Sequence, residues 1–381
     1  MNVGFVSDSF PMGGIAKVVT EIGAAIEEEG FSSFYLSALG DPTNYYSILE
    51  SKLYIPEKKI EETNFIKYRD KARKFFEMKL YNGQVDLSKY LLAQYENIVN
   101  FVNKNNLDYL IICRYDLTFL VSKIKNEFPK LKIFVWIHGP VEIYTKKKER
   151  KKYLTYYKKN LLACNKVICL TEFDLHELEK IDVSGIKIYN PISFRNRFFS
   201  EDTRKEKTIL CVSRLDIKDK GIDSLVKLAD VLPDGWRVKL VGSGNENELK
   251  KLNALLKKMK NRKKFVFLGP KRPMDLEEIY QQSSFFVSPS LYEGFGLSLV
   301  EAMNFGLPII AFETSGAREI TEEGKFGILV KDFSSDKLIK ECLMFVNNNK
   351  LIERYAKLSH FRSQKFAIKN IKKQWVSLLN D

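Results

Sequence analysis

The chain has 381 residues, of which 45% are apolar and 29% are charged, and this balance excludes an intrinsically disordered, collagen-like or low-complexity protein. The length favours two domains over one. Its 62 Lys and Arg residues outnumber its 48 Asp and Glu residues, which gives a net charge of +14 and favours a polyanionic partner such as nucleic acid, anionic lipid or nucleotide phosphate.

Neither a membrane span nor a secretory leader is predicted. No run approaches 18 consecutive apolar residues, and the first ten residues are typical of a strand rather than of a basic and apolar leader. The five cysteines are odd in number, widely spaced and without a C-x-x-C pair, which disfavours disulfides and a structural zinc site. We therefore expect a cytoplasmic protein whose cysteines are core thiols.

The first half of the chain predicts a parallel sheet. An apolar strand at 3–6 is followed by a glycine turn, Gly13-Gly14, and by a helix that has an apolar face. That face consists of Ile15, Val18, Val19, Ile22 and Ile26. Further apolar runs lie at 109–113, 133–137 and 166–170, separated by helix-length segments. Strands that are continuously apolar at this spacing indicate a sheet buried on both faces.

Two segments interrupt this pattern. Residues 41–100 are rich in Tyr, Lys, Asn and Glu and are interpreted as an insertion, and residues 189–207 form a polar, charged linker around Pro191. A second series of apolar runs follows the linker, at 208–212, 238–241, 265–268, 285–287 and 308–312.

We therefore predict an α/β protein of two doubly wound, Rossmann-like domains that enclose an inter-domain cleft, with ligands bound at the carboxyl ends of the strands. The domains are expected at 1–192 and 193–363. The last helix, at about 364–381, is expected to return to the first domain.

Three clusters that follow strand ends in the second half are candidates for chemistry. In the first, Arg214 and Lys220 flank a turn before a helix, an arrangement suited to a diphosphate because arginine offers a planar fork and lysine a mobile charge. The second is the turn Gly242-Ser-Gly244, where a backbone could approach a nucleotide closely. Hydride transfer is disfavoured there, because Asn247 stands where a dinucleotide fingerprint needs a third glycine.

The third cluster places Glu293 on a loop and Glu301 in the helix that follows. The N–H groups of Gly296 and Leu297 would point at an anion, and the two carboxylates could accept hydrogen bonds from sugar or ribose hydroxyls. Taken alone, each cluster could equally be a solvated loop, a helix cap or a surface salt bridge.

Together, the clusters resemble the nucleotide-binding domain of glycosyltransferase family 4, whose members have the GT-B fold. The matching motifs are Arg214, Lys220-Gly, Glu293-Gly-Phe-Gly-Leu, Glu301-Ala, Gly306-Leu-Pro-Ile-Ile and Gly316. The resemblance covers most of 205–332 and, more loosely, the first sixty residues and 130–195.

The resemblance implies a role for each matching residue. Arg214 and Lys220 would bind the donor diphosphate, Glu301 the ribose diol, and Glu293 hydroxyls of the transferred sugar. Backbone groups of Gly294, Phe295, Gly296 and Leu297 would donate to sugar and phosphate, with Gly242 and Lys271 also at the donor site and the base near 269–272.

In the first half, Gly13 and Gly14 match the family's glycine loop, which approaches the diphosphate and the acceptor. His138 matches a histidine beside the transferred sugar, near the reacting carbon. Without the resemblance, an ordinary helix entry and a structural histidine are the alternatives. The segment 41–100 has no counterpart in the family and Pro191 replaces a common glycine, so acceptor residues do not carry over.

The family's mechanism needs no metal and no other cofactor. The chain contains no D-x-D triplet, so the metal-bridged diphosphate of the other major transferase fold lacks its ligand pair. Arg214 and Lys220 would instead stabilise the charge that develops on the departing diphosphate. Family members generally retain anomeric configuration by front-face attack, in which the leaving phosphate accepts the acceptor's proton and Glu293 acts as a positioning residue.

We therefore expect a retaining glycosyltransferase that moves a sugar from a nucleotide sugar, most commonly a UDP-sugar in this family, to a hydroxyl acceptor. That acceptor would be a cell-surface polysaccharide, a glycolipid or a teichoic-acid-type precursor. Residues 142–159 hold eight basic and two acidic residues interleaved with tyrosines. We expect them to dock on the anionic inner face of the membrane, the alternative being a solvated helix face.

Three other functions compete with this one. A non-catalytic GT-B subunit of a transferase complex would be expected to lose Arg214, Lys220 or a glutamate, and all are present. Nucleic-acid binding would explain the charge, but the aromatic residues form no recognition motif. A sugar-nucleotide epimerase shares the architecture but has different motifs.

Overall fold

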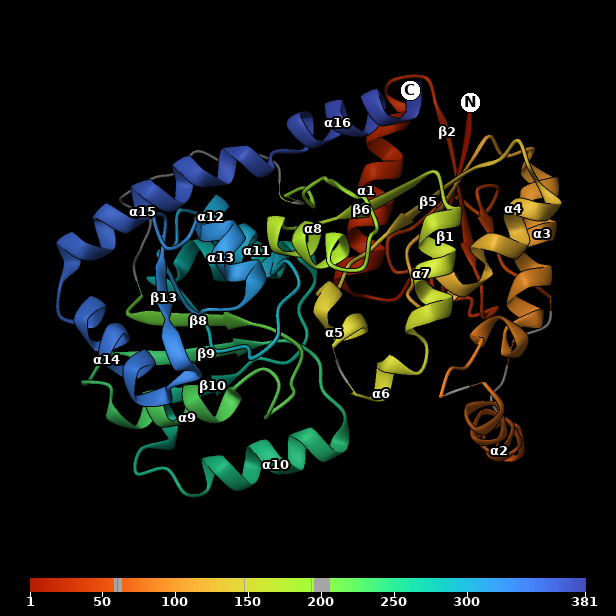
Figure 1. The fold of residues 1–381 in the computed structure, drawn as a ribbon. Helices are drawn as coiled ribbons and strands as arrows, with labels where there is room; N and C mark the ends of the chain where they lie inside the picture. The colour runs from red at the N-terminus through yellow and green to blue at the C-terminus, as the bar shows by residue number, and fades with distance from the viewer. Residues whose placement is uncertain (58–59, 61–63, 82, 147, 193, 195–205) are drawn as a thin grey trace. The chain divides into compact units, whose positions relative to one another are not determined.

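The structure, a computed structural model, describes residues 1–57, 60, 64–81, 83–146, 148–192, 194 and 206–381. These residues form two compact units, one made of Met1–Pro191 and Ile368–Asp381 and the other of Ile192–Ala367 (Figure 1). The sequence predicts divisions after residue 192 and near residue 364. Most of the predicted linker at 189–207 lies outside the described residues.

The first unit is built on seven parallel strands in the order β3-β2-β1-β4-β5-β6-β7. They are β1 (Asn2–Ser7), β2 (Ser32–Ser37), β3 (Leu53–Tyr54), β4 (Tyr109–Ile112), β5 (Lys132–Trp136), β6 (Lys166–Cys169) and β7 (Ile186–Lys187). The four apolar runs of the first half are β1, β4, β5 and β6, so the predicted parallel sheet is confirmed. The sequence does not predict β2, because half of its six residues are serines rather than β-branched or aromatic strand formers.

Helices cover this sheet. They are α1 (Gly14–Glu27), α2 (Asn64–Leu80), α3 (Leu92–Asn105), α4 (Val121–Glu127), α5 (Val141–Thr145), α6 (Lys148–Lys151), α7 (Leu154–Ala163), α8 (Glu172–Glu179) and α16 (Ile368–Asn380), with 3-10 helices η1 (Leu87–Tyr90) and η2 (Leu117–Leu120). In α1 the apolar face that the sequence predicts is the buried one, including Val18, Val19, Ile22 and Ile26. Among the described residues, no helix combines the length and the apolarity that a membrane crossing requires.

Part of the predicted insertion belongs to the framework. Residues 41–100 contain β3 and most of α3, whose Ile98, Phe101 and Val102 are buried where the helix packs on β1 and β2. α3 is the crossover helix that leads to β4, so only the segment around α2 departs from the alternation of strands and helices. The polar composition conceals α3 because three apolar side chains at helical spacing suffice to bury one face.

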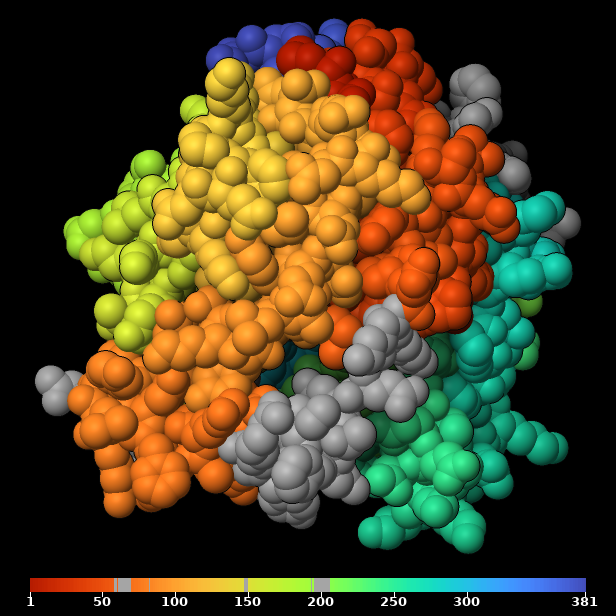
Figure 2. Space-filling view, turned by 90° about the vertical axis from the view of Figure 1, so that its right-hand side faces the viewer, coloured from red at the N-terminus to blue at the C-terminus, as the bar shows by residue number. Residues whose placement is uncertain are grey.

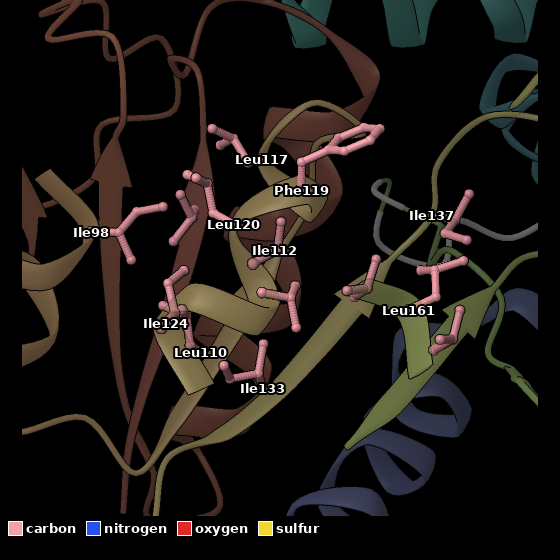
Figure 3. Close-up of a cluster of buried hydrophobic side chains, with 14 of the residues drawn as sticks. Ile98, Leu110, Ile112, Leu117, Phe119, Leu120, Ile124, Ile133, Ile137 and Leu161 are labelled. Carbon is pink, nitrogen blue, oxygen red and sulfur yellow. The ribbon is translucent and has the colours of Figure 1, made fainter. Parts of the chain in front are cut away.

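The core of the first unit lies between the sheet and its helices. Figure 3 shows one part of it, where Ile98 of α3, Leu110 and Ile112 of β4 and Ile124 of α4 lie near Ile133 of β5. All five side chains are fully withdrawn from solvent. The five cysteines of the chain are free thiols and four of them are buried, as the sequence predicts for core thiols.

The C-terminal helix lies in the first unit. α16 packs on α1, and the fully buried Trp375 contacts Trp136 of β5 with ring centroids 4.7 Å apart. Ile371 and Leu379 are buried on the same face. This last segment of the chain therefore completes the core of the unit in which the chain begins.

The second unit has six parallel strands in the order β10-β9-β8-β11-β12-β13. They are β8 (Thr208–Val212), β9 (Arg237–Val241), β10 (Phe265–Phe267), β11 (Phe285–Ser288), β12 (Ile309–Phe312) and β13 (Ile328–Val330). The five apolar runs of the second half form the first five of these strands. The helices are α9 (Ile222–Val231), α10 (Glu246–Leu256), α11 (Pro273–Gln282), α12 (Leu297–Asn304), α13 (Ser315–Thr321), α14 (Ser335–Val346) and α15 (Asn349–Ser363), with 3-10 helices η4 (Arg262–Lys264), η5 (Lys331–Phe333) and η6 (Gln364–Phe366).

Each sheet has one switch point, where two neighbouring strands are followed by connections that run in opposite directions along the sheet. In the first unit it lies between β1 and β4, and in the second between β8 and β11. Ligands of doubly wound proteins bind at the carboxyl ends of the strands beside this point. The loops that follow these four strands are therefore the expected ligand-binding loops.

Candidate active site

Loops at the carboxyl edge of the second sheet carry the predicted donor residues. Arg214 and Lys220 lie between β8 and α9, Gly242 follows β9, and Lys271 follows β10. Residues 293–296 lie between β11 and α12, and Leu297 begins α12. The predicted residues of the second half are thus gathered at one edge of one sheet, on both sides of its switch point.

Backbone hydrogen bonds hold these loops together. The N–H of Leu215 donates to the carbonyl of Ser243 at 2.7 Å, which joins the loops after β8 and β9. The N–H of Leu291 donates to the carbonyl of Asp219 at 2.9 Å, which joins the loops after β8 and β11. The loops therefore behave as one connected surface rather than as separate solvated turns.

Lys220 and Glu293 form an ion pair across the switch point. Nζ of Lys220 lies 2.6 Å from Oε2 of Glu293, and the two side chains are only 18% and 20% exposed. An ammonium has three N–H donors, so Lys220 can donate to a phosphate oxygen while it holds the carboxylate. The pair places a cation and a hydrogen-bond acceptor side by side, as a sugar diphosphate requires.

Two glycines allow the loops to approach so closely. A Cβ on Gly221, whose φ is +59°, would lie 2.2 Å from the carbonyl oxygen of Pro289. A Cβ on Gly316 would lie 2.6 Å from the carbonyl oxygen of Phe295, and the N–H of Gly316 donates to the carbonyl of Glu293 at 3.1 Å. The loop that carries Glu293 is thus held from both sides by backbone.

The loop after β11 ends at the N-terminus of α12. Gly296 is the N-cap residue, no side chain caps the helix, and its first turn holds no acidic residue. Phe295 is buried and contacts the ring of Phe366 at 5.9 Å, which anchors the loop in the core. The N-terminus of α12 therefore has the uncapped geometry that the sequence-predicted anion site requires.

Glu301 lies inside α12. The residue is almost fully buried, and the hydroxyl of Tyr280 in α11 donates to its Oε2 at 2.9 Å. Burial, with the neighbouring carboxylate as a second cause, holds the pKa of Tyr280 well above its usual value, so this hydroxyl stays a donor. Tyr280 therefore fixes the orientation of the carboxylate, a role that sequence reasoning missed.

The two remaining predicted cations are more exposed. Arg214 is 70% exposed, and its Nη2 lies 3.9 Å from Oδ2 of Asp216. Lys271 is half-buried in the loop between β10 and α11. The N–H of Gly242 donates to the carbonyl of Gly269 at 3.0 Å, so the Lys271 loop is tied to the glycine turn after β9.

The first unit has its own ion pair at its switch point. Nη2 of Arg114, which follows β4, lies 2.6 Å from Oδ2 of Asp8, which follows β1. The pKa of Asp8 is raised to about 6, chiefly by burial and also by the Asp116 carboxylate, while the Arg114 guanidinium acts in the opposite direction. Sequence reasoning missed this pair, although each residue follows an apolar strand, which is the rule that found Arg214 and Glu293.

A cavity of about 480 Å³ lies beside Arg114. Its lining includes Arg114, His138, Tyr115, Tyr144 and Arg150. The rings of Tyr115 and Tyr144 stack with centroids 4.3 Å apart, and the Arg150 guanidinium lies 4.5 Å from the Tyr115 centroid. The cavity thus combines aromatic faces with guanidinium groups and the Asp116 carboxylate, a lining suited to a polar, ring-containing ligand.

His138 faces this cavity as a neutral imidazole. Burial, with Arg114 as a second cause, lowers the pKa of His138 to about 3, and its ring contacts that of Trp136 at 4.4 Å. Nε2 is buried and has no hydrogen-bond partner among the described residues. The imidazole of His138 is therefore uncharged, which suits hydrogen bonding rather than charge stabilisation.

The glycine loop of the first half is exposed. Gly13 is the N-cap residue of α1 and Gly14 its first residue, and no side chain caps this helix. The hydroxyl of Tyr46, in the predicted insertion, lies 3.1 Å from both the N and the O of Gly13. The loop is therefore held from one side by a tyrosine that sequence reasoning missed.

The predicted site residues thus fall into two groups. Those of the second half follow strands β8 to β11 of one sheet. In the first unit, His138 lines the cavity, and Gly13 and Gly14 stand at the start of α1. No group of three or more histidine, cysteine or carboxylate side chains placed to hold a metal ion occurs in the part of the chain that the structure describes.

Solved structures similar to this one are glycosyltransferases of the GT-B fold. Sucrose-phosphate synthase from Thermosynechococcus elongatus has a TM-score of 0.80 at 18% identity, over 100% of this chain and 98% of that one. HepE from Anabaena, solved in complex with UDP-glucose, has a TM-score of 0.74 at 17% identity, over 100% of this chain and 99% of that one. The chain therefore has the GT-B fold of two Rossmann-like domains, as its sequence predicts.

Residues 193–360 match the family model of glycosyl transferases group 1. An uncharacterized glycosyltransferase from Haemophilus influenzae is 33% identical over 227 residues, or 57% of this chain and 62% of that protein. The poly(ribitol-phosphate) alpha-N-acetylglucosaminyltransferase of Staphylococcus aureus is 28% identical over 234 residues, or 60% of this chain and 47% of that protein. The matches thus span about three fifths and about half of these relatives. The residues that match the family model lie in the second unit.

Proposed function

We propose that this protein is a retaining, metal-independent glycosyltransferase of family 4 that moves a sugar from a UDP-sugar to a hydroxyl of a cell-surface polysaccharide, glycolipid or teichoic-acid-type precursor. The observation that carries the proposal is the Lys220–Glu293 pair at 2.6 Å, at the switch point of the unit that matches the family model. UDP-glucose in HepE and the polymer acceptor named for the Staphylococcus aureus relative support the choice of donor and acceptor.

In this mechanism the second unit stabilises the leaving group. Arg214, Lys220 and the N-terminus of α12 donate to the diphosphate, and these hydrogen bonds strengthen as negative charge develops on it. The bond between the sugar's anomeric carbon and the diphosphate oxygen breaks, and a bond from the acceptor oxygen to the same carbon forms on the same face. The acceptor proton passes to the leaving phosphate oxygen. Glu293 positions sugar hydroxyls, and Glu301, oriented by Tyr280, holds the ribose.

The cavity of the first unit is the proposed place for part of the acceptor. Stacked Tyr115 and Tyr144 offer aromatic faces to sugar rings or to a polyol chain, and Asp116 with Arg114, both in the lining, offers acceptors and donors to hydroxyls. The neutral His138 would accept or donate one hydrogen bond at the edge of this cavity. The acceptor's anchorage in lipid or wall polymer would place the enzyme at the cytoplasmic face of the membrane.

The proposal is tested with a panel of nucleotide sugars. Thermal shift against UDP-, GDP- and ADP-sugars identifies the donor, and transfer to an acceptor extract is then followed by mass spectrometry with and without EDTA. We expect stabilisation by a UDP-sugar and EDTA-resistant transfer with retained configuration. Donor binding without transfer would instead support a binding subunit.

The role of Glu293 is tested by Glu293→Gln. We expect a large loss of turnover without a covalent adduct, because the residue is a positioning group. A glycosyl-enzyme trapped on any side chain, or inversion at the anomeric carbon, would overturn the proposed mechanism.

A further inference from the structure

The helix α2 turns its apolar and basic residues toward solvent. Phe75, Phe76 and Leu80 are 51%, 63% and 75% exposed, whereas a helix of a folded unit normally buries such residues. Figure 2 shows the orange segment that holds α2 at the surface of the first unit. This arrangement is the reverse of an ordinary surface helix.

Charge is distributed on α2 in the same one-sided way. Lys71, Arg73 and Lys79 are exposed among the apolar side chains, and no Asp or Glu lies among the exposed residues 71–73, 75–76 and 79–80. The acidic residues are turned away: Glu77 is half-buried and accepts a hydrogen bond from Lys89 of η1 at 2.8 Å. The outward face therefore carries three cations, three large apolar side chains and no carboxylate.

The chain just beyond α2 contacts the basic segment 142–159. The N–H of Val85, just beyond α2, donates to the carbonyl of Lys152 at 2.7 Å. Within that segment, several cations make contacts inside the first unit and are therefore less available to a partner. Lys146 lies 2.9 Å from Glu177, Lys158 lies 2.7 Å from Asp182, and Arg150 lies over Tyr115.

We propose that the outward face of α2, residues 71–73, 75–76 and 79–80, is the surface by which this protein docks on an anionic lipid bilayer. Phenylalanine and leucine side chains that enter the acyl boundary, beside lysine and arginine at the headgroups, are the composition of an interfacial helix. A second copy of the chain is disfavoured as the occupant, because two such faces would bring six cations together without a carboxylate. The inference rests on the proposed function, in which the acceptor is anchored in a membrane. Its test measures membrane binding and does not depend on sugar transfer.

The test is flotation of the full-length protein with vesicles. One set is phosphatidylcholine alone and the other also contains phosphatidylglycerol. The apolar variant is Phe76→Ser with Leu80→Ser, and its control is Leu162→Ser with Met344→Ser, two exposed apolar residues on α7 and α14. The charge variant is Lys71→Gln, Arg73→Gln and Lys79→Gln, and its control is Lys257→Gln, Lys258→Gln and Lys260→Gln, which are exposed in the second unit.

We expect the wild type and both controls to float with phosphatidylglycerol vesicles at about 0.1 M salt and to be released at about 0.5 M. Removing the two apolar side chains should weaken binding roughly tenfold. Removing the three cations should weaken it on the order of a hundredfold, at roughly fivefold per cation. Circular dichroism and thermal melts confirm that the variants fold.

Three results would overturn the inference. They are no flotation by the wild type, equal flotation with both kinds of vesicle, and losses in the controls as large as in the variants. A wild-type dimer in light scattering that Phe76→Ser with Leu80→Ser dissociates, without vesicle binding, would assign the face to self-association. Vesicle binding without sugar transfer would leave this inference standing and contradict the proposed function instead.

Discussion

At the scale of single residues, Lys220 is the most informative position in the second unit. Its ammonium lies at the switch point, 2.6 Å from Glu293 and largely withdrawn from solvent, so that a hydrogen bond from it to phosphate is charge-assisted and shielded. Arg214, in contrast, is mostly exposed. Of the two cations, Lys220 should therefore contribute more to nucleotide affinity.

The variant Lys220→Ala tests this ranking. Loss of one charge-assisted hydrogen bond corresponds to about 1.5–3 kcal/mol, so the Kd for UDP should rise roughly tenfold to a hundredfold. Lys227→Ala, an exposed lysine on α9, is the matched control and should leave the Kd unchanged. Titration calorimetry measures both. Equal affinity in wild type and Lys220→Ala would remove the lysine from the donor site.

Asp8 makes the stability of the first unit depend on pH. Its pKa rises from 3.8 to about 6 on folding, chiefly because the carboxyl is buried. Between these values the folded state binds the proton that the unfolded state releases, so the stabilisation is complete below about pH 4 and is lost as pH rises through about 6. The loss is up to about 3 kcal/mol.

Asp8→Asn removes this dependence. The stability of the variant relative to wild type should therefore increase by up to about 3 kcal/mol from about pH 4 to about pH 7. Urea unfolding at the two pH values measures the difference, and contributions of other carboxyls cancel between the two proteins. A relative stability that is flat or falls with pH would mean that the Arg114 partner outweighs the burial of Asp8.

At the scale of elements, the site depends on how closely the loops after β8 and β11 pass each other. Gly221 makes this close approach possible because it has no side chain. Its φ is +59°, and a Cβ there would lie 2.2 Å from the carbonyl oxygen of Pro289. Since Leu291 also donates to Asp219, the distance between the two loops is set by backbone atoms. A methyl group at Gly221 should therefore separate Lys220 from Glu293.

Gly221→Ala and Gly235→Ala form a matched pair for this argument. Both glycines have positive φ, +59° and +85°, but around Gly235 the nearest atom to an added Cβ is a lysine side chain at 3.7 Å. Gly235→Ala should cost about 1 kcal/mol from backbone strain alone. Gly221→Ala should cost more and should also weaken UDP binding. Thermal melts and calorimetry separate the two effects, and identical behaviour of the two variants would mean that the loops tolerate separation.

The strands that the sequence predicts are those with continuous apolar runs. Nine such runs are strands of the two parallel sheets, because a strand covered on both faces must be apolar throughout. β2, with its serines, and the short edge strands β3 and β7 lack this signal. α3 was hidden for a related reason, since its buried stripe is only three residues among polar ones.

The site was partly predictable for the same reason. Arg214, Lys220 and Glu293 follow strand ends, and their spacing matched a family motif. Asp8 and Arg114 also follow strand ends, but their pairing depends on β1 lying beside β4, a neighbour relation that is not local in sequence. The bond from Tyr280 to Glu301 likewise joins α11 to α12, and no spacing rule predicts it.

At the scale of the whole molecule, the two units have separate cores. The first closes around Trp136 and Trp375, which lie 239 positions apart in sequence and 4.7 Å apart at their ring centroids. The second contains Trp236, buried against Phe285 with centroids 5.8 Å apart. Because each core belongs to one unit, damage to one should lower the stability of that unit first.

Trp375→Ala and Trp236→Ala test this independence by scanning calorimetry. Each truncation of a buried tryptophan should cost about 3–5 kcal/mol, which corresponds to a shift of roughly 10 °C in one transition of a unit of this size. Trp375→Ala should lower the transition of the first unit and Trp236→Ala that of the second. UDP should raise only the transition that Trp236→Ala lowers, since a ligand stabilises the unit that binds it. A single transition that both variants lower equally would mean that the units unfold as one cooperative body, and an increase by UDP in the Trp375-sensitive transition would move the nucleotide site to the first unit.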